Sequence, residues 1–334
     1  MKMLRHSNGI KKLKPKRNIS TFAIIKITIY SVISILLIFA IFQGMLEGIY
    51  DEKYPSRIKY TRIDEKKMYY NQSGSGDVTI IFDSDISLDL NEWNTIEKDL
   101  RDKYNVKVLQ YDRMGYGYSD GGNKIDIQKQ ADDLKLSLKK ANISGPYILV
   151  GAGYGSLVMT NFAKSYPDSV KGVVLIDPIN EKYIKNNEYI KNYTSKKLEY
   201  KAEYISAYFG LSFFRSKVGL LEVPDELFND SKEQVKDEFL SNRIRSKYSH
   251  AIYNEMLNLE EGVSTSQEEG ILGNKPLAIV SRTSNLEADK NLLLMSTSKY
   301  VNQITTDSNG QFIPLSDKNK TLEAIKYILE KINL

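Results

Sequence analysis

The chain has 334 residues, 41% of them hydrophobic, and a formal net charge of +5. It has no cysteine and only two histidines, which excludes disulfides and thiolate metal sites, so we expect neither a metal ion nor another cofactor. The first 26 residues hold eight of the 47 Lys and Arg residues and no acid, leaving 39 basic against 42 acidic residues. This weakly acidic remainder predicts no nucleic-acid partner.

The N-terminal segment predicts a membrane anchor. Residues 27–46 are 20 residues without a charge, and a helix of that length spans the roughly 30 Å of bilayer hydrocarbon. The basic tail, residues 1–26, predicts a cytoplasmic N-terminus. A cleaved signal peptide is the alternative, but Phe42 to Met45 offers no small-residue cleavage site. We therefore expect a single-pass protein of the cell membrane whose globular part lies outside the cytoplasm.

Strand and helix patterns alternate after this anchor. In chain order they predict strands at 58–63, 68–72, 78–82, 106–111 and 147–150, with helices at 89–104, 126–140 and 157–166. Ile127, Ala131, Leu134 and Leu138 form one apolar stripe, typical of a helix that packs on a core. Regular alternation of this kind favours a mostly parallel sheet covered by helices on both faces.

The alternation stops at residues 179–274, which are rich in Tyr and Lys and helical in pattern. It resumes with strands at 276–281 and 303–306 and a closing helix at 316–332. These limits predict an α/β core built from residues 55–178 and 275–334, with a helical insertion between its two parts.

A glycine-rich turn follows the predicted strand at 147–150. Residues 149–155 read Leu-Val-Gly-Ala-Gly-Tyr-Gly, the frame of a G-x-S-x-G nucleophile elbow with Gly153 in the serine position. Gly151, Gly153 and Ser156 also approximate a dinucleotide-binding G-x-G-x-x-G, with Asp177 as the ribose-binding acid. A plain Gly-rich turn between strand and helix is the third possibility. The local motif leaves all three open.

The sequences on either side of this turn resemble those of a known protein family. YDRMGYGYSD at residues 111–120 and YPDSVKGVVLIDP at 166–178 resemble strings of the α/β-hydrolase superfamily, particularly its proline iminopeptidase and haloperoxidase-like esterase branches. The resemblance implies an α/β-hydrolase-like sheet with a helical cap at 179–274 over the pocket. A dinucleotide fold normally places its Gly-rich turn after its first strand, whereas this turn follows several. Dinucleotide binding is therefore a distant alternative.

The resemblance also implies a serine nucleophile, a histidine base, an acid and an oxyanion hole. Gly153 has no side chain to act as nucleophile. The family's G-H-F-I-P string corresponds to residues 310–314, which puts Gln311 in the histidine position, and glutamine cannot accept a proton near neutral pH. In the oxyanion loop, where the family has His-Gly, the chain reads Asp83-Ser84-Asp85, and an inward carboxylate there would repel an oxyanion. The acid has no assigned position.

These replacements predict a membrane-anchored pseudoenzyme without a catalytic triad, whose pocket binds a small molecule, peptide or protein of unknown identity. The candidate pocket residues are Asp83, Ser84, Gly153, Tyr154 and Gln311.

A divergent surface hydrolase that cuts an ester or amide with other residues is the alternative. Asp83 and Asp85 could then act as an acid–base pair. Ser84, Ser119 and Ser156 have no histidine that the fold would bring to them, and His250 lies in the insertion, where we expect a structural role.

Overall fold

The computed structural model describes residues 20–53, 59–184, 187–221, 223–228, 233–261 and 266–332. The basic tail therefore lies outside the described residues up to position 19. The helices are α1 (Thr21–Lys53), α2 (Asn94–Lys103), α3 (Ile127–Lys140), α4 (Tyr154–Ser165), α5 (Asn187–Tyr208), α6 (Ser212–Lys217), α7 (Glu233–Arg243), α8 (Ser246–Glu261), α9 (Leu286–Lys290), α10 (Ile313–Ser316) and α11 (Lys318–Ile332). The strands are β1 (Lys59–Ile63), β2 (Lys66–Gly74), β3 (Thr79–Asp83), β4 (Lys107–Tyr111), β5 (Tyr147–Ala152), β6 (Val170–Ile176), β7 (Leu277–Arg282) and β8 (Val301–Thr306).

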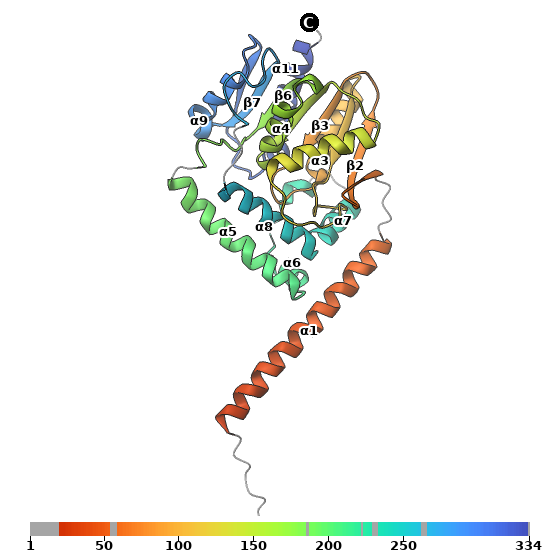
Figure 1. Ribbon diagram of the computed structural model, residues 1–334, viewed down its shortest axis with the longest axis vertical. Coiled ribbons are helices and arrows are strands. Elements are labelled where there is room, and N and C mark those ends of the chain that lie inside the picture. The colour runs from red at the N-terminus through yellow and green to blue at the C-terminus, as the bar shows by residue number, and fades with distance from the viewer. Residues whose placement is uncertain are drawn as a thin grey trace, which may run out of the picture.

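The eight strands form one sheet in the order β1-β2-β4-β3-β5-β6-β7-β8 (Figure 1). β1 and β2 form an antiparallel hairpin, and β2 pairs antiparallel with β4. The pairs from β4 through β3, β5, β6 and β7 to β8 are all parallel. The predicted mostly parallel sheet is confirmed. Because parallel strands end at the same edge, the loops that follow them gather there.

Both faces of the sheet are covered, as the apolar runs predict. Successive side chains of β3 point to opposite faces: Ile81 packs in a core with α3 and α4, whereas Ile80 and Phe82 pack in a second core with α2 and α11. The predicted stripe of α3 lies in the first core, and Trp93 lies in the second.

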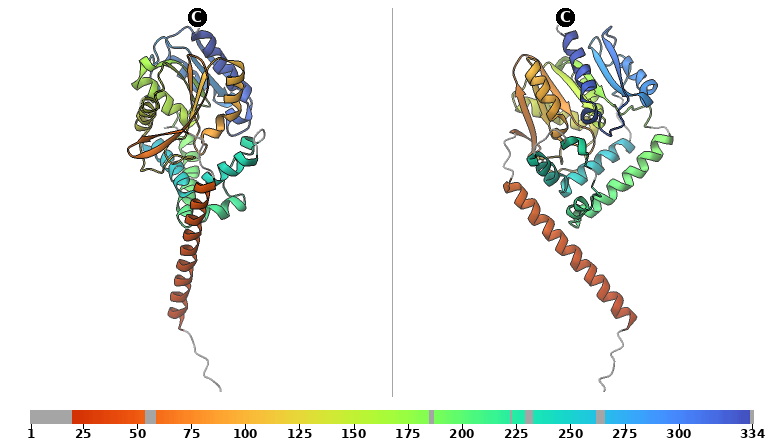
Figure 2. Two further views of the ribbon diagram at one scale, coloured as in Figure 1. Left: turned by 90° about the vertical axis from the view of Figure 1, so that its right-hand side faces the viewer. Right: turned by 180° about the vertical axis from the view of Figure 1, so that it is seen from behind.

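Helices α5 to α8 all lie between β6 and β7 in the chain, within the predicted insertion. We call residues 179–274 the insert. Its helices gather at one end of the sheet, on the side opposite the C-terminus (Figures 1 and 2).

α1 projects away from the domain beneath the insert (Figure 2). Its segment Thr21–Ile49 is long and apolar enough to cross a membrane, a description that also fits a signal sequence. The part that meets the insert is its C-terminal half, where Phe39 packs on Phe214 of α6 and Phe42 on Phe213.

Candidate functional site

The turn from β5 into α4 has the backbone of a strained elbow. Gly153 caps α4 with φ 46° and ψ −115°, a region that residues with a side chain rarely adopt. Its N–H donates to the Ile176 carbonyl at 3.0 Å, which ties the turn to the end of β6. The turn therefore has the shape that would lift a nucleophile above the sheet, although residue 153 has no side chain to lift.

The carboxyl group of Asp85 fills the space that a side chain at Gly153 would need. A Cβ built on Gly153 would overlap the Cγ and both oxygens of Asp85. Asp85 Oδ1 accepts hydrogen bonds from the Tyr154 N–H at 2.8 Å and from its own neighbour's N–H, Ile86, at 2.6 Å. These two donors, one after the elbow position and one in the loop after β3, are those that form an oxyanion hole in hydrolases with this turn. A carboxylate oxygen of the chain itself occupies that place.

Burial and hydrogen bonding shift the pKa of Asp85 in opposite directions. Burial raises the pKa of its carboxyl group to about 6, against the two backbone N–H donors and Arg113, which lower it, while the charge of Asp177 raises it further. The Asp85 N–H donates to Glu92 at 2.9 Å, which fixes the loop from the other side. At neutral pH Asp85 is therefore mostly ionised, an anion held where an oxyanion would form.

Asp85 and Gly153 open onto a cavity of about 720 Å³ between the carboxyl edge of the sheet and the insert. The polar lining residues come from both parts of the domain: Asp85, Asp177, Ser284, Asn285, Asp289 and Gln311 from the core, and Asn180 and Lys196 from the insert. The apolar part comes mainly from the insert: Ile179, Tyr183, Tyr193, Tyr200, Met256 and Leu259. The volume lies within the range of small-molecule sites.

Asp289 is the most deeply buried acid of this cavity. Its side chain is 2% exposed, and burial raises its pKa to about 7, helped by the charge of Asp177 and opposed by a hydrogen bond with Ser281. Its Oδ2 has no hydrogen-bond partner among the described residues. A buried oxygen without a donor costs free energy, so this atom is a ready acceptor for a donor group of a ligand.

Asp177 and Gln311 are held together by Arg282. Arg282 Nε donates to Asp177 Oδ2 at 2.6 Å, and its two terminal nitrogens donate to the carbonyls of Ser308 and Gln311 at 2.9 and 2.7 Å. Burial raises the pKa of Asp177 despite the attraction of Arg282. Asp177, the candidate ribose-binding acid, is thus ion-paired, and the Tyr154 N–H that begins α4 already donates to Asp85.

The sequence candidates separate into two groups. Gly153 and Gln311 line the cavity, whereas Asp83, Ser84 and Tyr154 are buried beside it and are not among its described lining residues. Asp83 pairs with Arg113 and accepts a hydrogen bond from Tyr111 at 2.7 Å, Ser84 bonds to the Asp89 carbonyl, and the Tyr154 hydroxyl accepts from Asn258. The carboxyl group that points to the elbow is that of Asp85, because Arg113 and Tyr111 hold Asp83 away.

Arg113, from the YDRMGYGYSD string, joins the core to the insert. Its guanidinium group bonds to Asp83 of β3 and to both carboxyl oxygens of Glu255 in α8, at 2.6 and 3.0 Å. Tyr116 also donates to Glu255, at 2.6 Å. All four side chains are buried. This string, which resembles a hydrolase motif, therefore positions α8 over the cavity.

The other serines and the histidine of the sequence analysis lie in structural positions. Ser156 donates to the Gly153 carbonyl and accepts from the Ile179 N–H, and Ser119 donates to the Asp112 carbonyl and accepts from the Tyr69 N–H. Both are buried. His250 stacks on Tyr204 at 4.9 Å between ring centroids, and burial lowers its pKa. It is not among the described residues that line the cavity.

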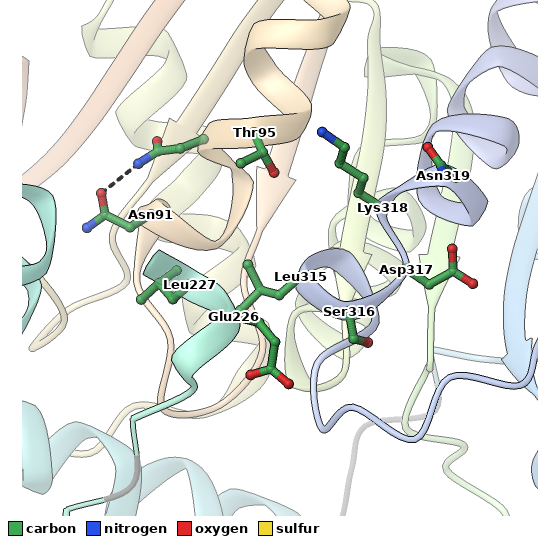
Figure 3. A pocket seen from close by; sticks show the side chains of 10 residues that line it. Asn91, Thr95, Glu226, Leu227, Leu315, Ser316, Asp317, Lys318 and Asn319 are labelled. Carbon is green, nitrogen blue, oxygen red and sulfur yellow. Dashed lines mark hydrogen bonds between the residues drawn. The ribbon is translucent and has the colours of Figure 1, made fainter. Parts of the chain in front are cut away.

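A second, smaller cleft of about 210 Å³ lies at the start of α2 and α11 (Figure 3). Its lining includes Leu227 and Leu315, which belong to one apolar cluster, and the polar side chains of Glu226, Asp317 and Lys318. It shares no described lining residue with the Gly153 cavity. Within the described ranges, no three His, Cys, Asp or Glu side chains gather in a way that could hold a metal ion.

Comparison with known proteins agrees with this geometry. The sequence profile of the alpha/beta hydrolase fold matches residues 87–322. Among solved structures, a thermophilic esterase from Thermogutta terrifontis superposes with a TM-score of 0.60 at 16% identity, covering 84% of this chain and 100% of that one. The Cif epoxide hydrolase from Acinetobacter nosocomialis gives 0.63 at 11% identity, covering 86% and 96%. At these identities the likeness concerns the fold alone.

Two curated relatives come from Bacillus subtilis. The uncharacterized protein YqjL is 29% identical over 109 residues, which cover 32% of this chain and 42% of YqjL. The uncharacterized protein YbdG is 30% identical over 118 residues, which cover 34% of this chain and 36% of YbdG. The matches thus span less than half the length of these relatives.

Proposed function

Because the chain belongs to the alpha/beta hydrolase fold family, we propose that it is a membrane-anchored member that binds a ligand in the Gly153 cavity without catalysing acyl transfer. One observation carries the proposal: the Asp85 carboxyl group occupies the space of the missing nucleophile and takes both N–H donors of the oxyanion hole. A negative charge at this place opposes the charge that develops in the transition state.

The other triad positions support the same function. Gln311, which the resemblance to the G-H-F-I-P string puts in the histidine position, lines the cavity and offers no group that could accept a proton. Loss of the nucleophile or the base of a triad typically lowers turnover by roughly a millionfold. Ser156 and Ser119 do not replace the nucleophile, because their hydroxyl groups are buried and bonded to the backbone.

The membrane part of the proposal rests on α1. An 18-residue window of its segment Thr21–Ile49 has a mean hydropathy of 2.5, and the helix projects from the domain. The basic residues that precede it favour a cytoplasmic N-terminus, which would place the cavity outside the cytoplasm.

The cavity supports a binding role, because it is open and is lined by carboxyl groups that can accept hydrogen bonds. The insert acts as a cap in this proposal: its tyrosines supply apolar walls, and Asp289 supplies a carboxyl group whose Oδ2 has no hydrogen-bond partner among the described residues. We therefore expect a small molecule with a hydrogen-bond donor or amine and an apolar part.

Catalysis is tested with the detergent-solubilised full chain, a fluorophosphonate probe and a panel of activated esters. We expect neither labelling nor turnover above that of the Ser156→Ala variant. Labelling of one serine, abolished by its substitution, would overturn the proposal.

Binding is tested by thermal shift against a library that contains primary amines and matched neutral analogues. We expect amine hits whose stabilisation is lost in Asp289→Leu and retained in Glu287→Gln, an exposed neighbour on the same short helix. If hits are absent at millimolar concentration, or survive in Asp289→Leu, the binding role of this cavity is wrong.

A carboxylate hydrolase is the second candidate, and one observation favours it. Burial raises the pKa of Asp85 to about 6 and that of Asp289 to about 7, values suited to proton transfer near neutral pH. Ester turnover that disappears in both Asp85→Asn and Asp289→Asn, without serine labelling, would establish this function in place of the first.

A further inference from the structure

The insert carries an apolar corner that the proposed ligand site does not use. We call residues 205–221, the end of α5, helix α6 and the loop after it, the corner. Its sequence, ISAYFGLSFFRSKVGLL, has no acidic residue and two basic ones, Arg215 and Lys217. Large apolar side chains on it are exposed, including Val218 at 66%, Leu220 at 63% and Tyr208 at 58%. An exposed apolar patch of this size usually marks a contact surface.

The corner is fixed directly to α1. Besides the ring contacts of Phe39 and Phe42, a Cβ on Gly210 would overlap the backbone carbonyl of Phe39, so the turn after α5 packs on the helix backbone itself. Gly210 has φ +70°, which a glycine adopts without strain. The corner therefore lies against α1 at the level of residues 39–42, as Figures 1 and 2 show for α6.

Polar contacts beside the corner hold the insert against the same part of α1. The Gln43 side chain is 4% exposed and donates to the Ile244 carbonyl at 2.9 Å, and the Ser246 N–H donates to Glu47 Oε1 at 3.2 Å. A buried glutamine at the end of an apolar helix is thus explained by docking of the insert.

This docking level sets the depth of the corner. Phe39 lies seven residues before Leu46, the end of the charge-free stretch. At 1.5 Å per residue it lies about 10 Å inside that end along the helix axis. Elements that lie in a membrane interface bury their apolar face by about 5–10 Å. The corner is therefore at interfacial depth wherever residues 27–46 cross the bilayer.

We propose that the corner inserts its apolar side chains into the membrane interface next to α1, so that the domain rests on the lipid surface through its insert. This inference depends on the membrane anchor of the proposed function. The occupant is the lipid of the bilayer that α1 crosses. Exposed Val218 and Leu220 would enter the acyl boundary, and Arg215 and Lys217, in the last turn of α6, would reach lipid phosphates.

The absence of native cysteine allows a direct test by single-site labelling. Val218→Cys, Leu220→Cys, Ile33→Cys in α1 and Glu330→Cys on α11 are each labelled with an environment-sensitive fluorophore. The full chain is then reconstituted in phosphatidylcholine–phosphatidylglycerol vesicles that contain brominated lipid. We expect labels at 218, 220 and 33 to be quenched at least about threefold more than the label at 330, which lies on the opposite side of the domain.

The label at residue 33 separates the two proposals. If it is quenched while 218 and 220 behave like 330, the anchor stands and the corner proposal is wrong. If it is not quenched, the anchor and the corner are both wrong. Labels at 218 and 220 that are shielded from lipid and also from aqueous iodide would mean that a protein covers the corner, which overturns lipid as its occupant.

Two matched glycine variants test the link to α1. Gly210→Ala adds a methyl group that overlaps Phe39, whereas Gly219→Ala meets nothing within 4 Å at a similar φ of +69°. With the label at 220, we expect Gly210→Ala to reduce the lipid quenching by about half and Gly219→Ala to leave it unchanged. Equal quenching in both variants would show that docking on α1 does not set the depth.

Discussion

Two pairs of acids, Asp83 with Glu255 and Asp85 with Asp289, lie where the carboxyl edge of the sheet meets the insert and α9, and they are built differently. Asp83 and Glu255 share the guanidinium group of Arg113 and each accept a further bond from a tyrosine. Asp85 and Asp289 face the cavity, where Asp85 bonds to backbone N–H groups and Asp289 has one oxygen without a hydrogen-bond partner in the part of the chain that the structure describes.

This difference distinguishes acids that stabilise the fold from acids that line the cavity. Burial raises the pKa of Asp83 and Glu255 as well, but each of these acids forms a direct ion pair with Arg113, which opposes that rise. Asp85 and Asp289 form no ion pair among the described residues: Arg113 lowers the pKa of Asp85 without pairing with its carboxyl group, and burial raises the pKa of both acids. Acids that remain costly to bury inside a cavity are candidates for function.

The largest expected effect comes from breaking the ion pairs of Asp83 and Glu255. Arg113→Met leaves Asp83 and Glu255 buried without their cation, and we expect a loss of about 3–5 kcal/mol in the free energy of unfolding. Denaturant unfolding followed through the single tryptophan, Trp93, measures it. The control is Lys326→Met, which breaks an exposed pair with Glu330 and should cost less than about 1 kcal/mol. Similar losses in both variants would contradict the scaffold role of Arg113.

A side chain at the elbow should cost nearly as much. Gly153→Ser forces a residue with a Cβ into strained torsions and expels the Asp85 carboxyl group, so we expect a loss of about 3 kcal/mol and no esterase activity. Gly273→Ser, with positive φ and open space, is the control for strain alone.

The same substitution in an Asp85→Gly background tests the coupling between the two sites. We expect at least about 1 kcal/mol of the loss to return. An undiminished loss would mean that Asp85 does not compete for this space.

Asp85 alone should change how stability depends on pH. Its folded pKa of about 6 exceeds its usual value of 3.8, so its contribution to stability is fully present below pH 4 and decreases as the pH rises through 6. Asp85→Asn removes this decrease. We expect the variant to be more stable than the parent by about 2 kcal/mol at pH 8 and equally stable at pH 4. Asp102→Asn, which replaces an exposed acid, should show no such difference. If Asp85→Asn is less stable than the parent at pH 8, the expected pH dependence is wrong.

The smallest effect is expected at His250. His250→Gln loses a half-buried stacking contact with Tyr204, worth about 1 kcal/mol or less. Ligand stabilisation in the thermal-shift assay should not change, because the side chain is not among the described residues lining the cavity. A change in binding larger than threefold would give this histidine a role in the site.

The sequence predicts the fold well because its signals are local. Alternation and apolar stripes placed the strands and helices of the core, and the strings at 111–120 and 166–178 indicated the family. The turn at Gly153 has the torsions that its glycine-rich frame suggests.

The site was predictable only in part. Which carboxyl group of Asp83-Ser84-Asp85 faces the elbow depends on Arg113, 28 to 30 residues away, and no local pattern contains that choice. The Asp289 oxygen without a described hydrogen-bond partner depends on burial by segments far apart in the chain. The corner did leave a signal, an acid-free apolar run within a charged insert, but its contact with α1 joins residues about 170 positions apart.

The position of Asp85 affects what a mutation from glycine to serine at residue 153 could achieve. A serine arising at 153 would meet an occupied hole and a glutamine at 311, so it would bring instability and no catalysis. Asp85 would have to be replaced first, by a change that confers no activity of its own. Under the proposed function, Gly153→Ser alone would therefore not produce a serine hydrolase.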